Sequence, residues 1–207
     1  NVQTHGNFTM TGGELLNGSA TNGGNVRVFR PGHFVLDGGT VSGGKCRNLS
    51  SNGGTGGNVF NVLGHTPTTS QTQVGTLTIK SGTIIGSTSN AVNGGIINIG
   101  LYGVVNVEGG TITDGTAIDR TYQDVLYPGR GGVFSMYAAN YTSNGVTSDR
   151  PAVLNISGGT ITGGIATNGG NIYNSGVLTV SGTGAMDGYS NTKLPPWNAV
   201  AKQITTL

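Results

Sequence analysis

Six copies of one short pattern run through the chain and constrain its fold more than any other feature. The pattern is apolar, any, apolar, any, Gly or Ser, Gly, and then usually Thr and an apolar residue. A unit repeated in this way predicts a solenoid, in which each copy buries its apolar face only by stacking on its neighbours. The copies read FTMTGGEL from Phe8, FVLDGGTV from Phe34, LTIKSGTI from Leu77, VNVEGGTI from Val105, LNISGGTI from Leu154 and LTVSGTGA from Leu178.

The composition agrees with an all-β solenoid and argues against several other classes. With 40 glycines in 207 residues and 9% charged side chains, the sequence does not favour a helical protein. Disordered chains share such a composition but lack apolar residues that keep a regular phase. A net charge of +2 gives no broad basic surface for nucleic acid. No apolar stretch reaches the roughly 18 to 20 residues that would cross a bilayer.

A second repeated signal is a Gly-Gly pair followed by a short apolar strand. Interleaved with the first pattern, it predicts three short strands per rung of a triangular coil, with about five to six rungs. Strand one follows the Gly-Gly pair, strand two is the apolar alternation and strand three is Thr-apolar-any, with Gly at the corners because tight bends need positive φ. The second signal reads GGNVRV from Gly23, GGNVFNV from Gly56, GGIINI from Gly94, GGVFSM from Gly131 and GGNIYN from Gly169.

Side chains alternate between the two faces of a strand, and this assigns an apolar core. The inward residues expected from strand one are Val26, Val59, Ile97, Phe134 and Ile172. Those from strand two are Phe8, Met10, Phe34, Leu36, Leu77, Ile79, Val105, Val107, Leu154, Ile156, Leu178 and Val180. Those from strand three are Leu15, Val41, Ile84, Ile112 and Ile161.

The stretch ISGGTITGGIATNGGNIYNSGVLTVSG, which begins at Ile156, resembles the repeats of right-handed parallel β-helix proteins. In particular it is similar to the Gly-Gly-Thr-Ile-Ser-Gly and Asn-Gly-Gly repeats of large secreted or cell-surface adhesin-like proteins of bacteria. The resemblance covers most of residues 1–188 and implies a pectin-lyase-like coil in an extracellular or surface setting. It is specific for the fold and not for the function, because such coils carry adhesins, polysaccharide lyases, glycosidases, tailspikes and structural fibres alike.

Long loops interrupt the repeat at two corners, and loops on a rigid scaffold are where binding usually resides. Aromatic side chains in the loops and the tail are candidates for stacking on sugar rings or for a protein interface, with packing onto the coil as the alternative. The loops span residues 43–52, 63–74, 116–130 and 137–150. The candidate residues are Tyr122, Tyr127, Tyr137, Tyr141 and Trp197.

No catalytic signature stands out, and the sequence predicts no enzyme and no cofactor. Glycosidic cleavage typically needs two carboxyl groups about 5 to 9 Å apart, and the loop residues form no recognisable pair. The loop candidates are Asp119, Asp124 and Asp149, with Arg120, Arg130 and Arg150. Outside the loops, the same outward position on three successive rungs holds Asp37, Lys80 and Glu108, which predicts a structural ion triad.

Strand three places two outward columns of small hydroxyl or methyl groups on one flat face. Regular Thr arrays resemble the ice-binding faces of β-solenoid antifreeze proteins, although Thr is also simply a good strand residue. Glu14 and Leu16 break the pattern in the first rung. The residues of the candidate face are Thr40, Thr83, Thr111, Thr113, Thr160 and Thr162.

The remaining polar residues give weaker signals. Cys46 is the only cysteine, so it is either an inert loop thiol or the site of an intermolecular bridge. The three histidines lack metal-ligand spacing, and no metal site is predicted. Of five Asn-x-Ser/Thr sequences, Asn48 and Asn140 are the best glycosylation candidates because they lie in long loops. A side-chain ladder is expected near the corner glycines from Asn22, Asn52, Asn93 and Asn168.

The repeat domain is expected to cover residues 1–188 and to be followed by a tail, residues 189–207. The tail is either a cap on the last rung or a strand that pairs with a neighbouring molecule. The first strand of the first rung is missing from the pattern, and we expect the sequence to be a piece of a longer protein. A non-enzymatic structural or adhesive role fits best, with self-assembly head to tail or with glycans or proteins as partners. The alternatives are a carbohydrate-active enzyme or tailspike-like module, and ice binding.

Overall fold

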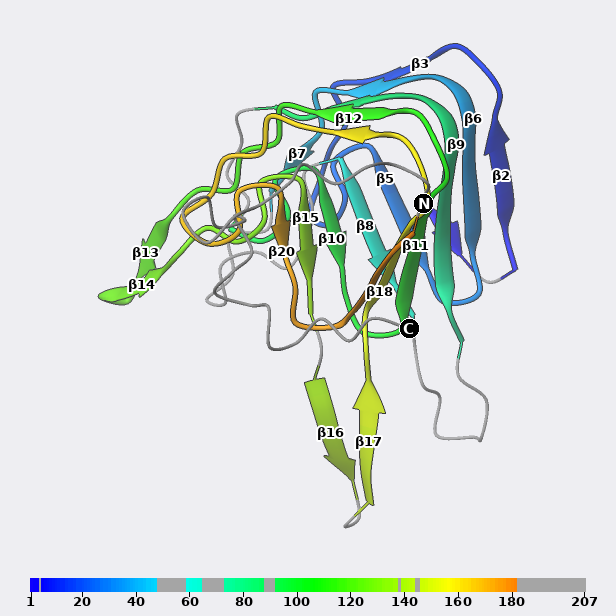
Figure 1. Cartoon of the computed structure of the whole chain (residues 1–207). Helices are drawn as coiled ribbons and strands as arrows, with labels where there is room; N and C mark the ends of the chain where they lie inside the picture. Colours follow the sequence, from blue (N-terminus) through cyan, green and yellow to red (C-terminus); the bar gives the residue numbers. More distant parts are fainter. Residues whose placement is uncertain are drawn as a thin grey trace, which may run out of the picture.

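The computed structural model describes residues 1–3, 5–47, 59–64, 73–87, 92–137, 139–143 and 146–181. The regular elements of these residues are all β-strands, without a helix, and the two largest sheets are formed by parallel pairs. In Figure 1 the strands of each sheet lie side by side, and two hairpins project away from them. The all-β class with parallel sheets, which the repeats predict, is therefore confirmed.

The first of these sheets collects the strands that follow the Gly-Gly pairs. Its neighbouring strands are all parallel. Its order is β1 (Val2–Gln3), β5 (Val26–Phe29), β8 (Phe60–Leu63), β10 (Ile97–Ile99), β15 (Phe134–Met136) and β20 (Ile172–Tyr173). β1 pairs with β5 through Val2 and Val28, so the expectation that the first strand is missing was wrong. The sequence signal failed there because no Gly-Gly pair precedes Val2.

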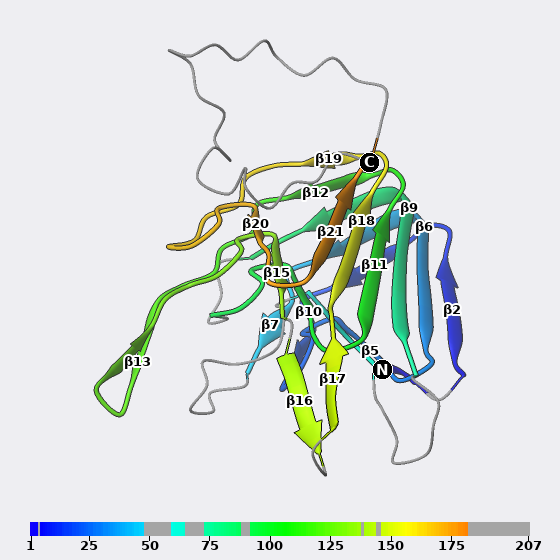
Figure 2. The same ribbon diagram turned by 60° about the horizontal axis from the view of Figure 1, so that its bottom comes forward.

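The second sheet has nine strands and collects the other two strands of each repeat (Figure 2). β6 (His33–Ser42) and β9 (Gly75–Ile85) each run through the glycine corner and so contribute to both halves. The part of this sheet that is formed by strand two of the repeat, the apolar alternation, also contains β2 (Asn7–Met10), β11 (Gly103–Val107), β18 (Val153–Ile156) and β21 (Val177–Val180). The part that is formed by strand three, the Thr-apolar strand, also contains β3 (Glu14–Leu16), β12 (Thr111–Thr113) and β19 (Thr160–Ile161).

The long connections contain regular structure of their own. One pair of short parallel strands, β4 (Ser19–Ala20) and β7 (Lys45–Cys46), follows the Thr-apolar strands. Two connections expected to be loops instead form antiparallel hairpins, which project in both views of the ribbon. The hairpins consist of β13 (Arg120–Tyr122) with β14 (Val125–Tyr127), and β16 (Ala139–Ser143) with β17 (Val146–Arg150).

The core consists of inward columns in which each residue pairs with its counterpart in the next copy of the repeat. Phe34, Leu77 and Val105 form one such column. Leu36, Ile79 and Val107 form the next column, and the side chains of both columns are buried. Burying a Leu, Ile or Phe side chain contributes about 1.5 to 3 kcal/mol, so stacked copies provide most of the stability. The inward assignment of strands two and three is confirmed for every residue except Phe8 and Val180, which are exposed at the two ends.

One inward assignment in strand one was wrong by a residue. Val26 pairs with Phe60, and Phe60 pairs with Ile97, so Phe60 rather than Val59 occupies this column. Val59 is buried at the preceding corner, where its carbonyl accepts hydrogen bonds from the amides of Asn25 and Val26. The error arose because the second copy reads GGNVF, with one residue more between the Gly-Gly pair and the strand.

The predicted ion triad is also wrong. β6 and β9 stay in register as far as Leu36 and Ile79, and then the register shifts so that Asp37 pairs with Ser81. Ser81 Oγ donates a hydrogen bond to Asp37 Oδ1 at 3.4 Å. Lys80 is the extra residue at this β-bulge and does not lie opposite Asp37, which the spacing of the repeat alone could not reveal.

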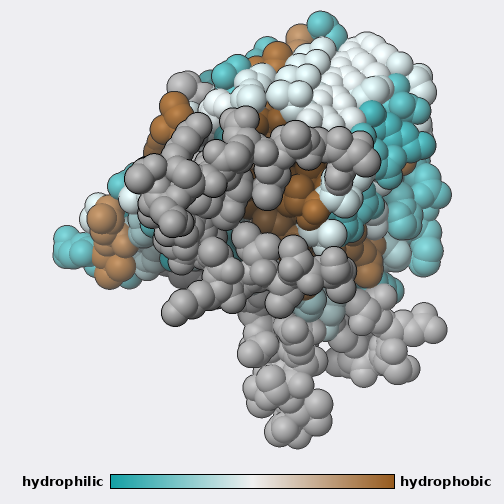
Figure 3. Space-filling model, in the orientation of Figure 1, coloured by the Kyte–Doolittle hydropathy of each residue, from teal (hydrophilic) through white to brown (hydrophobic). Residues whose placement is uncertain are grey.

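The core is well covered in the middle copies and open at both ends. Phe8, in the first copy, is 43% exposed, whereas its register partner Phe34 is 2% exposed. Val180, in the last described copy, is 69% exposed, whereas Val107 in the same column is fully buried. The space-filling view shows hydrophobic atoms inside the hollow that faces the reader (Figure 3). The inward columns therefore end in apolar side chains that solvent reaches.

Candidate functional site

The outer face of the six-stranded sheet carries a continuous column of polar and aromatic side chains. Arg27 on β5 pairs with Asn61 on β8, and the pairing continues in register through each later strand. These residues alternate with the inward core residues and so lie on the opposite face of the sheet. We call this set the polar column; it consists of Arg27, Asn61, Asn98, Ser135 and Tyr173.

The middle of the polar column is buried although it lies outside the core. Asn61 is fully buried, and Asn98 and Ser135 are nearly so. Asn98 Nδ2 donates a hydrogen bond to Asn61 Oδ1 at 3.2 Å. This bond orients the Asn61 amide and leaves its Nδ2 as a buried donor with no partner among the described residues. Buried donors nearly always have an acceptor, so this one marks an incomplete polar site.

Arg27 is the second unsatisfied donor in the polar column. Its Nε is buried and has no hydrogen-bond acceptor among the described residues. Its guanidinium carbon lies 4.4 Å from the centre of the Phe29 ring, and that of Arg30 lies 5.1 Å from the same ring. Desolvation by burial, and secondly the charge of Arg30, hold the pKa of Arg27 below its ordinary value. The two guanidinium groups thus concentrate positive charge around one aromatic ring.

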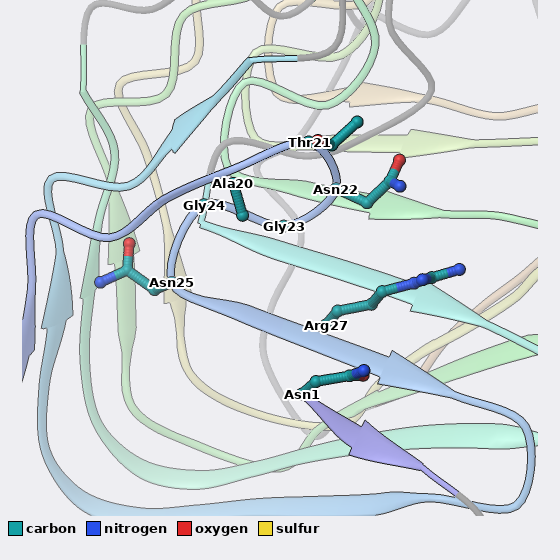
Figure 4. Close-up of a pocket in the computed structure, with 8 residues that line it drawn as sticks. All are labelled: Asn1, Ala20, Thr21, Asn22, Gly23, Gly24, Asn25 and Arg27. Carbon is teal, nitrogen blue, oxygen red and sulfur yellow. The ribbon is translucent and has the colours of Figure 1, made fainter.

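A cavity of about 280 Å³ opens beside Arg27. In Figure 4 the side chains of Asn1, Asn22 and Arg27 point to the same side of the cavity, whereas Asn25 points the other way. Asn25 Nδ2 instead donates to the carbonyls of Leu15, at 2.7 Å, and of Ser42, at 3.0 Å. The cavity is lined by Asn1, Ala20, Thr21, Asn22, Gly23, Gly24, Asn25 and Arg27.

Gly23 joins this cavity to the polar column. Its φ is +64°, and a Cβ at this position would lie 3.0 Å from the amide nitrogen of Asn61. The close approach of the two backbones places the cavity wall directly beside β8. Arg27 lines the cavity, whereas Asn61 is its register partner on β8 and does not belong to the lining. Arg27 therefore connects the cavity to the polar column.

The Thr residues of the candidate flat face do lie in register. Thr40, Thr83, Thr111 and Thr160 form one column, and Thr113 pairs with Ile85 in the second. Thr162 Oγ1 donates a hydrogen bond to Thr113 Oγ1 at 3.3 Å. The two columns are partly or fully exposed in every copy. We call this surface the threonine face; it consists of Thr40, Ser42, Thr83, Ile85, Thr111, Thr113, Thr160 and Thr162.

The candidate aromatic residues do not gather into one site. Tyr122 and Tyr127 belong to the two strands of the β13–β14 hairpin, and Tyr141 lies on β16 in the other hairpin. Tyr137 is exposed at the end of β15, and Trp197 lies outside the described residues. The β13–β14 hairpin instead exposes two aliphatic side chains, Val125 and Leu126, and hydrophobic atoms are visible there in Figure 3.

Asp119 has a structural role in the fold. Its Oδ1 accepts hydrogen bonds from the amide of Gly129, at 2.8 Å, and from the hydroxyl of Thr167. These bonds, that from Thr167 first, lower the pKa of Asp119. Asp124 lies at the tip of the β13–β14 hairpin with φ of +60°, and Asp149 lies on β17 in the β16–β17 hairpin. The catalytic candidates thus belong to different elements.

The other polar candidates are placed as follows. Cys46 is buried on β7 rather than in a loop, and its Sγ donates to the carbonyl of Thr21 at 3.0 Å, so the thiol is not available for an intermolecular bridge. Asn48 lies outside the described residues, and Asn140 lies on β16 paired with Asp149. No group of three or more potential metal ligands (His, Cys, Asp or Glu) gathers among the described residues.

The expected asparagine ladder at the corners is interrupted. Asn93 and Asn168 both pair with Arg130, which takes this position in the copy between them, and Asn52 lies outside the described residues. Asparagine ladders occur elsewhere: Asn98 bonds to Asn61, and Asn155 Nδ2 donates to Asn106 Oδ1 at 2.9 Å. Sequence reasoning missed the polar column, although the residue between the two inward residues of each Gly-Gly signal, Arg in GGNVRV and Asn in GGIINI, could have indicated it.

Comparison with known proteins adds no assignment to this site. No protein-family model matches the chain, and searches of curated proteins and of solved structures return no significant match. The described part of the chain has no helix of the length and apolar character that a bilayer crossing needs. Inferences about function therefore rest on the residues and the geometry above.

Proposed function

We propose that the chain is a right-handed parallel β-helix with a non-enzymatic structural or adhesive role outside the cell or at its surface. The strand orders support the coil, because each copy of the repeat adds one parallel strand to the six-stranded sheet and one or two to the nine-stranded sheet. The resemblance to adhesin-like repeats supports the setting. The loop carboxylates support a role without catalysis, because Asp119 is engaged by Gly129 and Thr167.

The observation that carries the structural role is the exposure of the inward columns at both ends. Phe8 and Val180 occupy core positions yet are exposed, and strand edges at the two ends lack neighbouring strands among the described residues. A parallel edge with an apolar side facing inward is a template for another strand. Head-to-tail stacking would bury both ends in a single contact and continue every column from one molecule into the next.

Electron microscopy at increasing protein concentration tests this assembly. We expect filaments with a repeat close to the length of one molecule, and we expect Val180→Asp to abolish them by burying a charge in the junction. Val125→Asp is the matched control, because Val125 is exposed on a hairpin and not in a core column. Dispersed monomers at every concentration, or equal filaments from Val180→Asp, would overturn head-to-tail assembly.

A second function, ice binding, is favoured by one specific observation, the register of the threonine face. Alternate residues on a strand lie about 6.6 Å apart and neighbouring strands about 4.8 Å apart, so two columns in register form a flat regular lattice. We expect Thr111→Tyr to remove thermal hysteresis and ice-crystal shaping, whereas Thr9→Tyr, on the exposed part of β2, leaves them unchanged. Absence of both effects in the unmodified protein would eliminate this function.

A further inference from the structure

Two buried donors without acceptors lie side by side at the start of the polar column. Arg27 and Asn61 are register partners on β5 and β8, and adjacent strands are about 4.8 Å apart. Arg27 Nε and Asn61 Nδ2 are both buried and unpaired among the described residues. A single unpaired donor is an isolated defect, but two on neighbouring strands define a place for one acceptor group that takes both hydrogen bonds.

The orientation of Asn61 makes its free group a donor. Its Oδ1 already accepts a hydrogen bond from Asn98, which leaves the amide nitrogen for a ligand. Arg27 presents donors only, so the two side chains together require a group that accepts two hydrogen bonds. A carboxylate meets this requirement, because its two oxygens are held in one plane and match the parallel N–H bonds of a guanidinium group.

The charge around the two donors also favours an anion. Arg27 and Arg30 both approach the Phe29 ring, and no carboxylate is paired with either of them in the described part of the chain. Burial and the neighbouring Arg30 both disfavour the charged form of Arg27, as the lowered pKa shows. A bound anion would offset both effects, since its charge favours the charged form of Arg27 and its oxygen satisfies the buried donor.

The rest of the cavity indicates what carries the carboxylate. Thr21 and Asn22 line it together with Arg27, and Asn22 points to the same side as Arg27 (Figure 4). A hydroxyl and a carboxamide can each donate and accept, as the hydroxyl groups of a sugar do. A volume of about 280 Å³ is close to the lower end of the range for small-molecule sites.

We propose that Arg27 and Asn61 bind the carboxylate of a sugar acid, with Asn22 and Thr21 contacting its hydroxyl groups. This proposal rests on the adhesive role proposed above and names the ligand class of that role. Such a sugar acid can be a repeating unit of an acidic glycan or its terminal unit. Binding of one unit would attach the coil to a carbohydrate surface. Arg30, which also lies against the Phe29 ring, adds attraction for the anion.

Titration calorimetry of the whole chain with glucuronate tests the proposal, and NMR of the Arg27 Nε–H group locates the contact. We expect saturable binding of glucuronate, a shift of the Nε–H signal, and no binding of glucose, which lacks the carboxylate. Arg27→Gln is expected to weaken binding at least tenfold. Lys80→Gln removes the same charge from an exposed site on the nine-stranded sheet and is expected to leave binding unchanged.

Asn61→Asp separates binding from a purely structural role. The new carboxylate would lie beside Arg27 and occupy the position of the ligand, so we expect thermal stability to rise while glucuronate binding is lost. If Arg27→Gln fails to fold, Asn61→Asp still tests the proposal. A ligand site predicts that the unmodified protein binds glucuronate and that Asn61→Asp does not, whereas a purely structural pair predicts no binding in either protein. Filament formation is measured in parallel, so loss of the assembly and loss of the site are distinguishable.

Several results would overturn the proposal. Equal binding of glucose would show that the carboxylate is not recognised, and equal loss in Arg27→Gln and Lys80→Gln would show that only net charge matters. Binding of acetate, sulfate or an acidic peptide as tight as that of glucuronate would exclude a sugar acid as the specific ligand. No saturable binding of glucuronate at millimolar concentration would remove the site altogether.

Discussion

The polar column and the threonine face are built from the same repeat but differ in almost every property. Along the threonine face, Thr40, Thr83, Thr111 and Thr160 repeat one residue type and remain partly or fully exposed. Along the polar column the residue changes in nearly every copy, and its middle members are buried. The strand pairing is parallel on both surfaces, so the backbone does not cause the difference.

The two columns also differ in the contacts that their side chains make. A column that keeps one residue type in four successive copies, as Thr40, Thr83, Thr111 and Thr160 do, needs only to pair with itself, and substitution of one of these residues disturbs little. A column that changes from copy to copy carries individual contacts, such as the bond from Asn98 to Asn61 and the unpaired donor of Arg27. The polar column should therefore be far less tolerant of substitution than the threonine face.

The largest effect is expected at the corner that leads into the six-stranded sheet. Gly131 has φ of +63°, and a Cβ there would collide with the carbonyl oxygen of Phe134. We expect Gly131→Ala to destabilise the protein by more than about 2 kcal/mol, because left-handed strain alone costs roughly 1 to 2 kcal/mol. Thermal unfolding should show a fall of the midpoint by more than about 4 °C.

Gly12 provides the matched control for this change. A Cβ at Gly12 would meet no atom within 4 Å. Gly12→Ala should therefore leave the midpoint unchanged or raise it slightly, since alanine reduces the freedom of the unfolded chain. Equal losses from the two variants would mean that the corner before β15 is not packed as tightly as its backbone contacts indicate.

A smaller effect is expected in the middle of the polar column. Asn98→Ala removes the donor to Asn61 Oδ1 and leaves that acceptor buried, which costs about 1 to 3 kcal/mol. Asn106→Ala breaks a similar ladder to Asn155, but Asn106 is only half-buried and water can replace the lost bonds, so about 0.5 to 1 kcal/mol is expected. Denaturant unfolding of the two variants compares them directly, and a larger loss for Asn106→Ala would reverse the contrast.

On the threonine face the effect should be smaller again. Thr111→Val keeps the β-branched shape that suits a strand and removes one partly exposed hydroxyl, so the unfolding free energy should change by less than about 0.5 kcal/mol. The same denaturant measurement applies. A loss above about 1 kcal/mol would show that the hydroxyl columns hold the copies together, which their partial exposure does not indicate.

The sequence predicted the interior better than either outer surface. The alternation of Phe34 with Leu36 and of Leu77 with Ile79 determines which residues face inward, because burial imposes period two on any strand with one covered side. It failed at Val59 and at Lys80, where one additional residue changes the register. The bulge at Lys80 leaves the spacing of the apolar residues unchanged and so gives no signal in the sequence. The extra residue before Phe60 is visible when GGNVFNV is compared with GGNVRV.

The candidate site could not be predicted for a related reason. Arg27 and Asn61 are neighbours only because of the register of β5 with β8. The chain between them includes a connection whose length differs from copy to copy, so the sequence does not fix this register. Their unpaired donors become visible only when every possible acceptor has been placed. The β13–β14 hairpin was likewise hidden, because Gln123 and Asp124 turn with positive φ although neither is Gly. The β16–β17 hairpin could have been predicted, because Asn-Gly separates Ser143 from Val146 in the sequence.

The smallest expected effect is local and depends on pH, at the loop contact of Asp119. Its bonds to Gly129 and Thr167 lower its pKa in the folded protein, so they contribute stability at pH values above the ordinary pKa of an aspartate. That contribution is lost as the pH falls through the lowered pKa, when the carboxylate is protonated. Hydrogen exchange at the Gly129 amide should therefore accelerate, relative to its intrinsic rate, below about pH 4. In Asp119→Asn this extra acceleration should be absent, while global unfolding changes little because the carboxylate is exposed to solvent. An amide whose protection does not depend on pH in the unmodified protein would mean that the backbone alone positions this loop.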